Sequence, residues 1–577
     1  MKNQSTAKVQ VNDAGVVHLP VRFVGATRND GTGRAGATKI RLMRPLTPGS
    51  ATSYAETELF TQQLAALVQK FQVVRFMDFL ATNWSQQRVW ADRTLPTTAF
   101  WGRDTAPAYH DTTYGGGQWG WQGRGAPYEY AILFANAMKR DAWINIPAGA
   151  DDDYVQRVAQ MFLYGSDGKN PYPSPQANPV FPPLAPGLRL YVEYSNEVWN
   201  GSFGVQFNMN LDLAQAEVAA GNSPLDFDKS GANRWELGFR RMAKRGVEIS
   251  KIFRSVFGDA AMMTRVRPVY MSQAYNAWVG FQGLRLLHGY YNNGEGDFVS
   301  DPHPPSYYFY GAGGAAYYNP DNNSGSLTVD NIWDSFSMSL ATWSGSVMDQ
   351  GFVPGVWNVA ALGVKSVAYE GGPDMYYTGS GEAAKAAAWG DPRMADSVVG
   401  HHEAWSSFGG DVLVYFTAAQ AGDHWYEWSF VKSIHDQATP KLQAIDRLRG
   451  TPRVAVSLGH GIPSTVTGAE FHVDSAGWRR PGTGSQGYKA GNGTQTFAWA
   501  NYAYHPGSGS TATVTLAVSG ASADAQVGAY WNGVLLGTKP ATGTVSFGSV
   551  DVDPHMLHGL IVRAVSGSFN LDSIDVR

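Results

Sequence analysis

Segments typical of strands alternate with segments typical of helices over most of the 577 residues, and this alternation limits the possible folds more than any other feature. The helix-like segments, such as ELFTQQLAALVQKF (58–71) and PYEYAILFANAMKR (127–140), place apolar residues at helical spacing. The strand-like segments are 39–45, 73–80, 143–147, 188–196, 266–273, 306–318, 364–370 and 411–418. Alternation of this kind favours parallel β/α units over a sandwich.

Eight strands with intervening helices predict an α/β fold, a (β/α)8 TIM barrel over residues 39–450. Catalytic residues of such barrels lie at the carboxyl ends of the strands, so position on a strand becomes a functional clue. Residues 1–38 are predicted to form an N-terminal β segment packed on the barrel.

The pattern changes after residue 450. Short alternating runs such as ATVTLAVSG (512–520), AQVGAYWNG (525–533) and HGLIVRAVSG (558–567) are separated by Gly, Ser, Asn and Pro. This pattern and the length of 451–577 predict one antiparallel β-sandwich domain.

Composition excludes several classes of function. A net charge of -4 and a pI near 6.4 argue against a nucleic-acid partner, and the sequence has no apolar run of the length that spans a membrane. The start, MKNQSTAKVQ, lacks the apolar core of a signal peptide, so such a peptide is expected to be absent or already removed. Without cysteine there is neither a disulfide framework nor a thiol nucleophile, whereas 19 Trp and 28 Tyr suit surfaces that stack on sugars.

Two glutamates occupy the positions where a barrel places its chemistry. Glu197 lies just beyond the fourth predicted strand, in YVEYSNEVWNG (191–201), and Glu370 ends the seventh. Glycoside hydrolysis needs two such groups, a protonated acid for the leaving oxygen and an ionised nucleophile or base. Glu193 is the alternative to Glu197, because an even number of residues separates them and either side chain can point inward.

Asn196-Glu197 after one strand and VAYEGG (367–372) at the end of another resemble glycoside hydrolase clan A, the retaining barrel enzymes. Further segments are similar to a set of bacterial clan A-like proteins often described as cellulose-binding. These segments are RFMDFLATN (75–83), WADR (90–93), PYEYAILFAN (127–136), WINIPAGADDDYV (143–155) and EYSNEVWN (193–200). The resemblance spans roughly residues 39–450.

The resemblance implies that Glu197 is the acid/base, with a raised pKa, and that Glu370 is the ionised nucleophile. It also implies that Asn196 hydrogen bonds the sugar 2-hydroxyl and that Arg75 hydrogen bonds the nucleophile. An ion pair with Asp78 is the structural alternative for Arg75.

Two aromatic residues complete the predicted site. Tyr317 is the candidate for the tyrosine that donates to the nucleophile, with Tyr310 and Tyr318 as alternatives. Trp425, after the eighth strand, is expected to stack under the sugar. The adjacent His401 and His402 are not expected to share a metal ion, because neighbouring side chains diverge. They are interpreted instead as the start of a surface helix.

HGLIVRAVSGSFNLDSIDVR (558–577) resembles the final hairpin of family 6-like carbohydrate-binding modules, which implies that Asn570 contacts sugar. Trp478, Trp499 and Tyr502 are candidate stacking platforms. The doubled acidic motif of such modules is reduced to a single acid at Glu470, which argues against their structural calcium. A sandwich that only packs on the barrel is the alternative.

The sequence therefore predicts a secreted or periplasmic bacterial glycosidase, monomeric and without metal or cofactor, whose partner is a polysaccharide or oligosaccharide. A β-glucan such as cellulose is the expected substrate of its double displacement. Two alternatives stay open: a non-hydrolytic carbohydrate-binding protein on a barrel scaffold, and an exo-acting or transglycosylating enzyme on exopolysaccharide.

Overall fold

The structure is a computed structural model, and it describes most of the chain from residue 43 onward. The described residues are 43–98, 101, 125–319, 327–341, 352–375, 381–419, 428–468, 473–474, 477–478, 488–490, 497–504 and 510–577. The predicted N-terminal β segment, 1–38, lies outside them.

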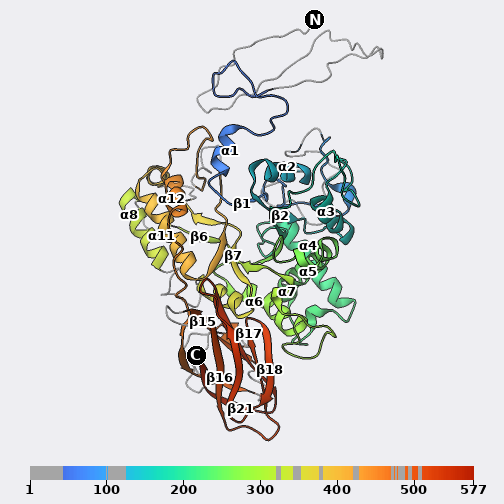
Figure 1. Ribbon diagram of the computed structural model, residues 1–577, viewed down its shortest axis with the longest axis vertical. Coiled ribbons are helices and arrows are strands. Elements are labelled where there is room, and N and C mark those ends of the chain that lie inside the picture. Colours follow the sequence, from blue (N-terminus) through green and yellow to red (C-terminus); the bar gives the residue numbers. More distant parts are fainter. Residues whose placement is uncertain are drawn as a thin grey trace. The chain divides into compact units, whose positions relative to one another are not determined.

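The chain divides into two compact units, Met1–Gln62 and Gln63–Arg577. In the first unit, the described residues include an antiparallel bridge between Pro45 and Ser53. The second unit holds a parallel sheet with its helices and two antiparallel sheets (Figure 1).

Seven parallel strands form the central sheet, in the order β1-β2-β3-β4-β5-β7-β9. Their bounds are β1 Val73–Arg75, β2 Asp141–Ile146, β3 Leu190–Tyr194, β4 Val266–Met271, β5 Gly311–Gly313, β7 Lys365–Ala368 and β9 Gly410–Leu413. Every residue of β2 is buried, as expected for a strand covered on both faces. The prediction of parallel β/α units is confirmed.

The first predicted strand, 39–45, is not part of this sheet in the described residues, where β1 and β9 are the two edges. Its described end reaches only the isolated bridge at Pro45, a residue without the N–H that a strand interior needs. The single strand predicted over 306–318 is also wrong. Pro305 opens a short helix there, α7 Pro305–Tyr308, and β5 and β6 (Ala316–Tyr318) follow separately.

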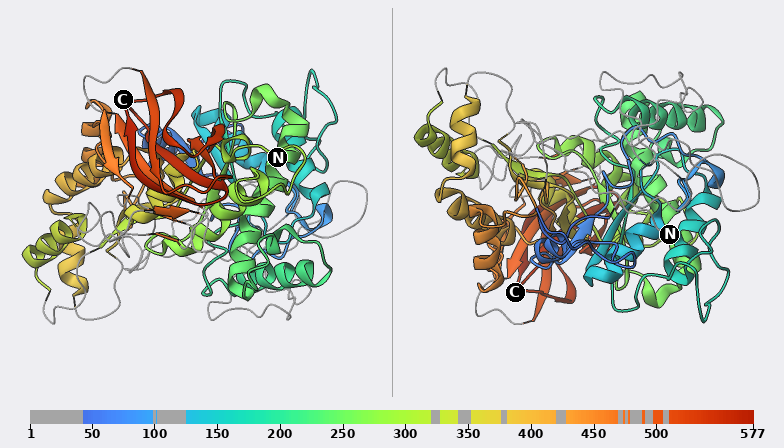
Figure 2. Two further views of the ribbon diagram at one scale, coloured as in Figure 1. Left: turned by 90° about the horizontal axis from the view of Figure 1, so that it is seen from below. Right: turned by 90° about the horizontal axis from the view of Figure 1, so that it is seen from above.

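Helices connect and cover the parallel strands (Figures 1 and 2). Their bounds are α1 Gln62–Val68, α2 Tyr128–Met138, α3 Asp152–Tyr164, α4 Gly204–Ala219, α5 Arg234–Phe257, α6 Ala277–Leu286, α8 Val329–Ala341, α9 Val353–Ala361, α10 Glu382–Trp389, α11 Arg393–Ser407 and α12 Pro440–Arg449. Shorter turns are η1 Trp90–Asp92, η4 Pro224–Asp226, η5 Asp259–Ala261 and the π-helix η6 Leu287–Tyr291. The longest, α5, begins with a capping box between Asn233 and Glu236, the sequence signal expected of a helix start.

Two sheets follow α12 and share one buried core, as the predicted sandwich requires, and they are antiparallel except that β10 pairs with β15 in parallel. One has the order β13-β12-β15-β20-β17-β18 with β10 beside β15, and the other β11-β21-β16-β19 with β14 beside β21. The bounds are β10 His460–Ile462, β11 Ser464–Thr467, β12 Val473–Asp474, β13 Gly477–Trp478, β14 Tyr488–Ala490, β15 Phe497–Tyr504, β16 Thr511–Ser519, β17 Gln526–Trp531, β18 Val534–Pro540, β19 Gly543–Asp551, β20 Leu557–Ser566 and β21 Phe569–Val576. Burial along β16 alternates, with Val514 and Leu516 in the shared core.

The sandwich is joined to the β/α part by a continuous core. Tyr530 and Ile561 of the sandwich belong to the same buried cluster as Val359 and Leu362 at α9. Backbone approaches are close here, because a Cβ on Gly559 would lie 2.1 Å from the Cα of Ala361. The two parts therefore share a packed interface within the second unit.

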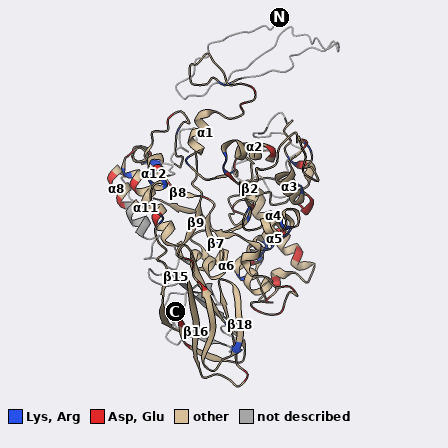
Figure 3. Cartoon of the chain, in the orientation of Figure 1, with Lys and Arg blue, Asp and Glu red and all other residues tan. Residues whose placement is uncertain are grey.

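Figure 3 marks the charged residues along the chain. Acidic and basic residues intersperse on the helices, and the antiparallel strands are nearly all uncharged (Figure 3). Among the residues that the structure describes, no helix has the length and apolar character needed to cross a membrane.

Candidate functional site

The register of the first three parallel strands places four site residues side by side. Arg75 of β1 lies opposite Trp143 of β2, and Asn145 of β2 lies opposite Glu193 of β3. Because alternate residues of a strand share a face, Trp143 and Asn145 point to the same side of the sheet. Pairing alone thus gathers a cation, a carboxylate, an indole and an amide.

Arg75 is the centre of this arrangement. Its Nε and Nη2 donate to the two oxygens of Glu193 at 2.9 and 3.0 Å, and its Nη1 donates to Glu370 Oε1 at 2.9 Å. Nη2 also donates to Asn196 Oδ1 at 2.7 Å. The Arg75 side chain is only 4 % exposed, and burial of the ion pairs raises its attraction to both carboxylates. Asp78, the alternative partner, has an exposed side chain.

Glu370 follows the end of β7 and is held by a second donor. The hydroxyl of Tyr317, on β6, donates to Glu370 Oε2 at 2.8 Å. The two alternative tyrosines bond elsewhere: Tyr310 donates to Asp411, and Tyr318 pairs with Ser397 at 2.7 Å. Of the three tyrosines, Tyr317 is the one that contacts Glu370.

Glu197 lies beyond β3 on a turn of unusual backbone geometry. Ser195 and Glu197 both have positive φ, 52° and 42°, a conformation that costs non-glycine residues about 1–3 kcal/mol. Tyr369 donates to Glu197 Oε1 at 2.7 Å, and Asn200 Nδ2 donates to Oε2 at 2.7 Å. The turn thus ends the strand and directs Glu197 toward the segment that carries Glu370.

Burial dominates the electrostatics of the site. It raises the pKa of Glu370 to about 8; Arg75 opposes this shift, and the nearby Glu197 carboxylate adds to it. Burial, together with the same carboxylates, raises the pKa of Tyr317 and of Tyr369 well above the usual tyrosine range. Both tyrosines are therefore neutral donors, and the raised pKa favours a proton on Glu370 at neutral pH, whereas the sequence predicted an ionised Glu370.

Asn196, which precedes Glu197, is 1 % exposed and bonded at both ends of its amide. Its Oδ1 accepts from Arg75, and its Nδ2 donates to Asn83 Oδ1 at 3.0 Å. Gln206 of α4 donates to the same Asn83 oxygen at 2.9 Å. In this structure Asn196 links Arg75 to the loop after β1.

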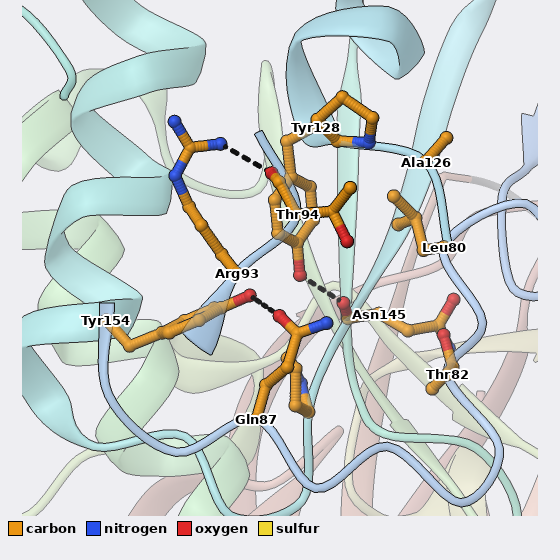
Figure 4. Close-up of a pocket in the computed structure, with 11 residues that line it drawn as sticks. Leu80, Thr82, Gln87, Arg93, Thr94, Ala126, Tyr128, Asn145 and Tyr154 are labelled. Atoms are coloured by element: carbon orange, nitrogen blue, oxygen red, sulfur yellow. Dashed lines mark hydrogen bonds between the residues drawn. The ribbon is translucent and has the colours of Figure 1, made fainter. Parts of the chain in front are cut away.

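A small cavity lies beside Asn145, on the side shown in Figure 4. Tyr128 donates to the backbone oxygen of Asn145 at 2.8 Å, and Tyr154 donates to Gln87 at 2.6 Å (Figure 4). The volume of this cavity, about 10 Å³, accommodates at most about one water, so the cavity is not a sugar site. Arg93 on its wall forms a second buried ion pair, with Glu129.

Other predicted site residues are not brought to this cluster. Trp425 lies outside the described residues. Asn570 is on β21 of the sandwich, paired with Ser519 of β16 and close to Gly520. Trp478 falls on β13, and Trp499 and Tyr502 fall on β15, in strands whose side chains are not described; Glu470 lies outside the described residues.

No group of three or more metal-ligating side chains occurs among the described residues. The interpretation of His401 and His402 as a surface helix start is wrong, because both lie inside α11 and His401 is fully buried. His401 Nε2 pairs with the Ala316 backbone oxygen at 2.9 Å, and His402 Nδ1 with Tyr415 at 3.1 Å.

Sequence reasoning missed three contacts of the site. Tyr369 and Asn200 hold Glu197, and Trp143 donates to Glu193 Oε2 at 2.8 Å. Tyr369 and Asn200 adjoin the quoted motifs, and Trp143 carries a signal only when the strand register is known. Glu193, considered as the alternative acid/base, is instead 1 % exposed and fully engaged by donors.

No protein-family model matches the sequence, and no curated protein matches it. Among solved structures, a GH51 arabinofuranosidase from Xanthomonas axonopodis pv. citri is similar, with 12% identity over 88% of this chain and 90% of that one and a TM-score of 0.40. A family 51 alpha-L-arabinofuranosidase from Bifidobacterium longum has 11% identity over 88% and 91%, with a TM-score of 0.39. The carbohydrate-binding module CBM36, solved with calcium and xylotriose, has 12% identity over 20% of this chain and 99% of its own, with a TM-score of 0.15.

Proposed function

We propose that the chain is a retaining glycoside hydrolase of clan A type, with Glu197 and Glu370 as its catalytic pair. One observation carries the proposal: two carboxylates that follow parallel strands each accept a hydrogen bond from a neutral tyrosine, and one of them also accepts a hydrogen bond from Arg75. Double displacement needs one group to attack and one to transfer a proton, and the proposal assigns these roles to Glu370 and Glu197.

In the proposed mechanism, Glu370 attacks the anomeric carbon as the glycosidic C–O bond breaks. Arg75 and Tyr317, the donors to its two oxygens, position the carboxylate for attack. Glu197 gives its proton to the leaving oxygen, then accepts one from the water that releases the sugar from Glu370. Atoms and charges balance without a cofactor or metal ion.

Two donors support the assignment of Glu370 as the nucleophile. Arg75 and Tyr317 both stabilise negative charge on Glu370, which opposes the effect of burial and favours the ionised form that attack requires.

For the substrate we infer a polysaccharide with β-linkages, and a β-glucan such as cellulose is the specific proposal. Asn196 is proposed to bind the sugar 2-hydroxyl through its remaining amide hydrogen, and Trp425 to stack under the ring. Asn570 is proposed as a sugar contact on the sandwich. The enzyme is proposed to work outside the cytoplasm as a monomer, with a catalytic β/α domain over 39–450 and a sandwich domain over 451–577.

The test is release of reducing sugar from cellulose, mixed-linkage glucan, mannan, xylan and curdlan. Activity on one polymer is expected to fall by at least about 10³-fold in Glu197→Gln and in Glu370→Gln, while the exposed Glu58→Gln keeps wild-type activity. Full activity of either catalytic variant would contradict the assignment.

A carbohydrate-binding protein that does not hydrolyse is the second candidate. It is favoured if the wild-type chain is retained on a polysaccharide in pull-down without releasing sugar. An exo-acting or transglycosylating enzyme on exopolysaccharide would instead release single sugars or longer products, which chromatography of the products separates from endo cleavage.

A further inference from the structure

We propose that Glu193 is a positioning residue for Glu370, because its carboxylate holds Arg75 in place and neutralises it. This inference deepens the proposed function and rests on it. It assigns a task to the third glutamate of the cluster, which neither attacks sugar nor transfers a proton.

Burial raises the pKa of Glu193, but its contacts with Arg75, Trp143 and Asn145 oppose this shift and favour the ionised form. Its Oε1 accepts from Arg75 Nη2, and its Oε2 accepts from Arg75 Nε, from Trp143 Nε1 at 2.8 Å and from Asn145 Nδ2 at 2.8 Å. All four of these partners are N–H donors, so a proton on this carboxyl would face no acceptor among them. A protonated Glu193 would also leave the buried guanidinium with less compensation, which is costly.

Geometry makes Glu193 the support of Arg75. Two parallel N–H···O bonds fix the plane of the guanidinium, and that plane in turn fixes the direction of Nη1 toward Glu370. Trp143 and Asn145 lock Glu193 from the neighbouring strand, and Asn145 is itself held by Ser195 O at 2.6 Å. The strand register thus positions Glu193, Glu193 positions Arg75, and Arg75 positions the proposed nucleophile, Glu370.

Charge gives Glu193 its second effect. One guanidinium serves two carboxylates, so the positive charge of Arg75 is already balanced by Glu193 before Glu370 ionises. Glu197 and Asp78 add further negative charge near Glu370, and the other polar neighbours, Tyr317 and Tyr369, are neutral. Across the sheet, the register partner of Glu193 on β4 is the apolar Val269. Arg75 thus orients Glu370 without fully compensating it.

The main experiment compares the pH dependence of kcat/KM in the wild type, Glu193→Gln and Glu193→Asp. Without the Glu193 charge, Arg75 stabilises ionised Glu370 more strongly, so the acidic limb in Glu193→Gln should move down by about one pH unit. Aspartate keeps the negative charge on a side chain that is one methylene shorter. The acidic limb of Glu193→Asp should therefore stay in place. Its kcat should fall about tenfold, because the shorter side chain no longer holds Arg75 in position.

The control is Glu129→Gln, which removes an equally buried bidentate partner, that of Arg93. It should lower stability without moving the acidic limb. The inference is overturned if Glu193→Gln leaves the limb and kcat unchanged, or if Glu129→Gln moves the limb as far. If Glu193→Gln does not fold, as judged by circular dichroism, full kcat in Glu193→Asp overturns it instead.

A measurement without substrate separates this inference from the proposed function. Burial holds the pKa of folded Glu370 near 8, above its ordinary 4.5, so the stability that its proton contributes is present below pH 4.5 and is lost as pH rises toward 8. The melting temperature of the wild type should therefore fall as pH rises from 4.5 toward 8. This fall should be absent in Glu370→Gln, and in Glu193→Gln it should be complete at a lower pH. An inactive wild type that shows these profiles defeats the proposed function alone. Identical profiles in the wild type and Glu193→Gln defeat the inference alone.

Discussion

The hydroxyl of Tyr369 donates a 2.7 Å hydrogen bond to Glu197, so the residue that precedes one carboxylate of the pair holds the other one. Adjacent side chains at the end of β7 diverge, and this divergence lets a single segment position both groups. Glu370 turns instead to Arg75 and Tyr317.

Tyr369→Phe should therefore lower kcat/KM by about tenfold or more, because a hydrogen bond to a charged group is worth roughly 1.5–3 kcal/mol. The ring remains, so packing and melting temperature should change little. Tyr310→Phe, which removes a partly buried hydroxyl bonded to Asp411, is the control and should keep most activity. Equal losses in both variants would show that the effect is not specific to Glu197.

Arg75→Met should destabilise the fold as well as abolish activity. It leaves Glu193 buried without its cation, and removal of one partner of a buried pair costs about 3–5 kcal/mol. Urea unfolding of the wild type and the variant measures this loss. A variant as stable as the wild type would mean that Glu193 takes up a proton at little cost.

Two fully buried histidines should make the fold sensitive to acid. Burial lowers the pKa of His288, and of His401, to about 3, whereas the ordinary value is 6.5. The unfolded chain therefore binds more protons between pH 6.5 and 3, and stability should fall across this window by up to about 1.4 kcal/mol per pH unit for each group.

His288→Gln should show a shallower acid loss than the wild type when unfolding is followed from pH 7 to pH 4. The exposed His555→Gln serves as the control and should follow the wild-type curve. A His288 variant with an unchanged slope would place the acid sensitivity elsewhere.

The backbones of the sandwich and of α9 approach closely at their interface, so one added methyl group there should destabilise the fold. Gly559→Ala would place its Cβ 2.1 Å from the Cα of Ala361 in α9, and overpacking of this kind typically costs about 1–3 kcal/mol. Gly355→Ala, at an open position in the same helix, should be neutral or slightly stabilising. Thermal unfolding of both variants measures the difference.

The periodic pattern predicted the architecture because parallel strands covered by helices leave a strong apolar signal, as in β2 and β3. It overstated strand lengths where proline and glycine interrupt the backbone, as around Pro305 and Gly313. Those interruptions depend on local φ and on helix starts, which an apolar run does not reveal.

At the site, the motifs pointed to Glu197 and Glu370 because each directly follows a strand. They did not reveal that Glu193 pairs with Arg75, since this contact joins residues 118 positions apart. Only the register of β1, β2 and β3 brings them together. Long-range pairing of this kind has no periodic signal in one sequence.

Because Tyr530, Ile561 and Leu362 share one core, the C-terminal sandwich cannot be removed or exchanged without exposing apolar side chains. A chain shortened near residue 450 would expose the apolar side of α9, the helix that leads into β7. Protein engineers who seek a smaller catalyst should therefore expect aggregation from deletion, and should replace the sandwich-facing apolar residues before removing it.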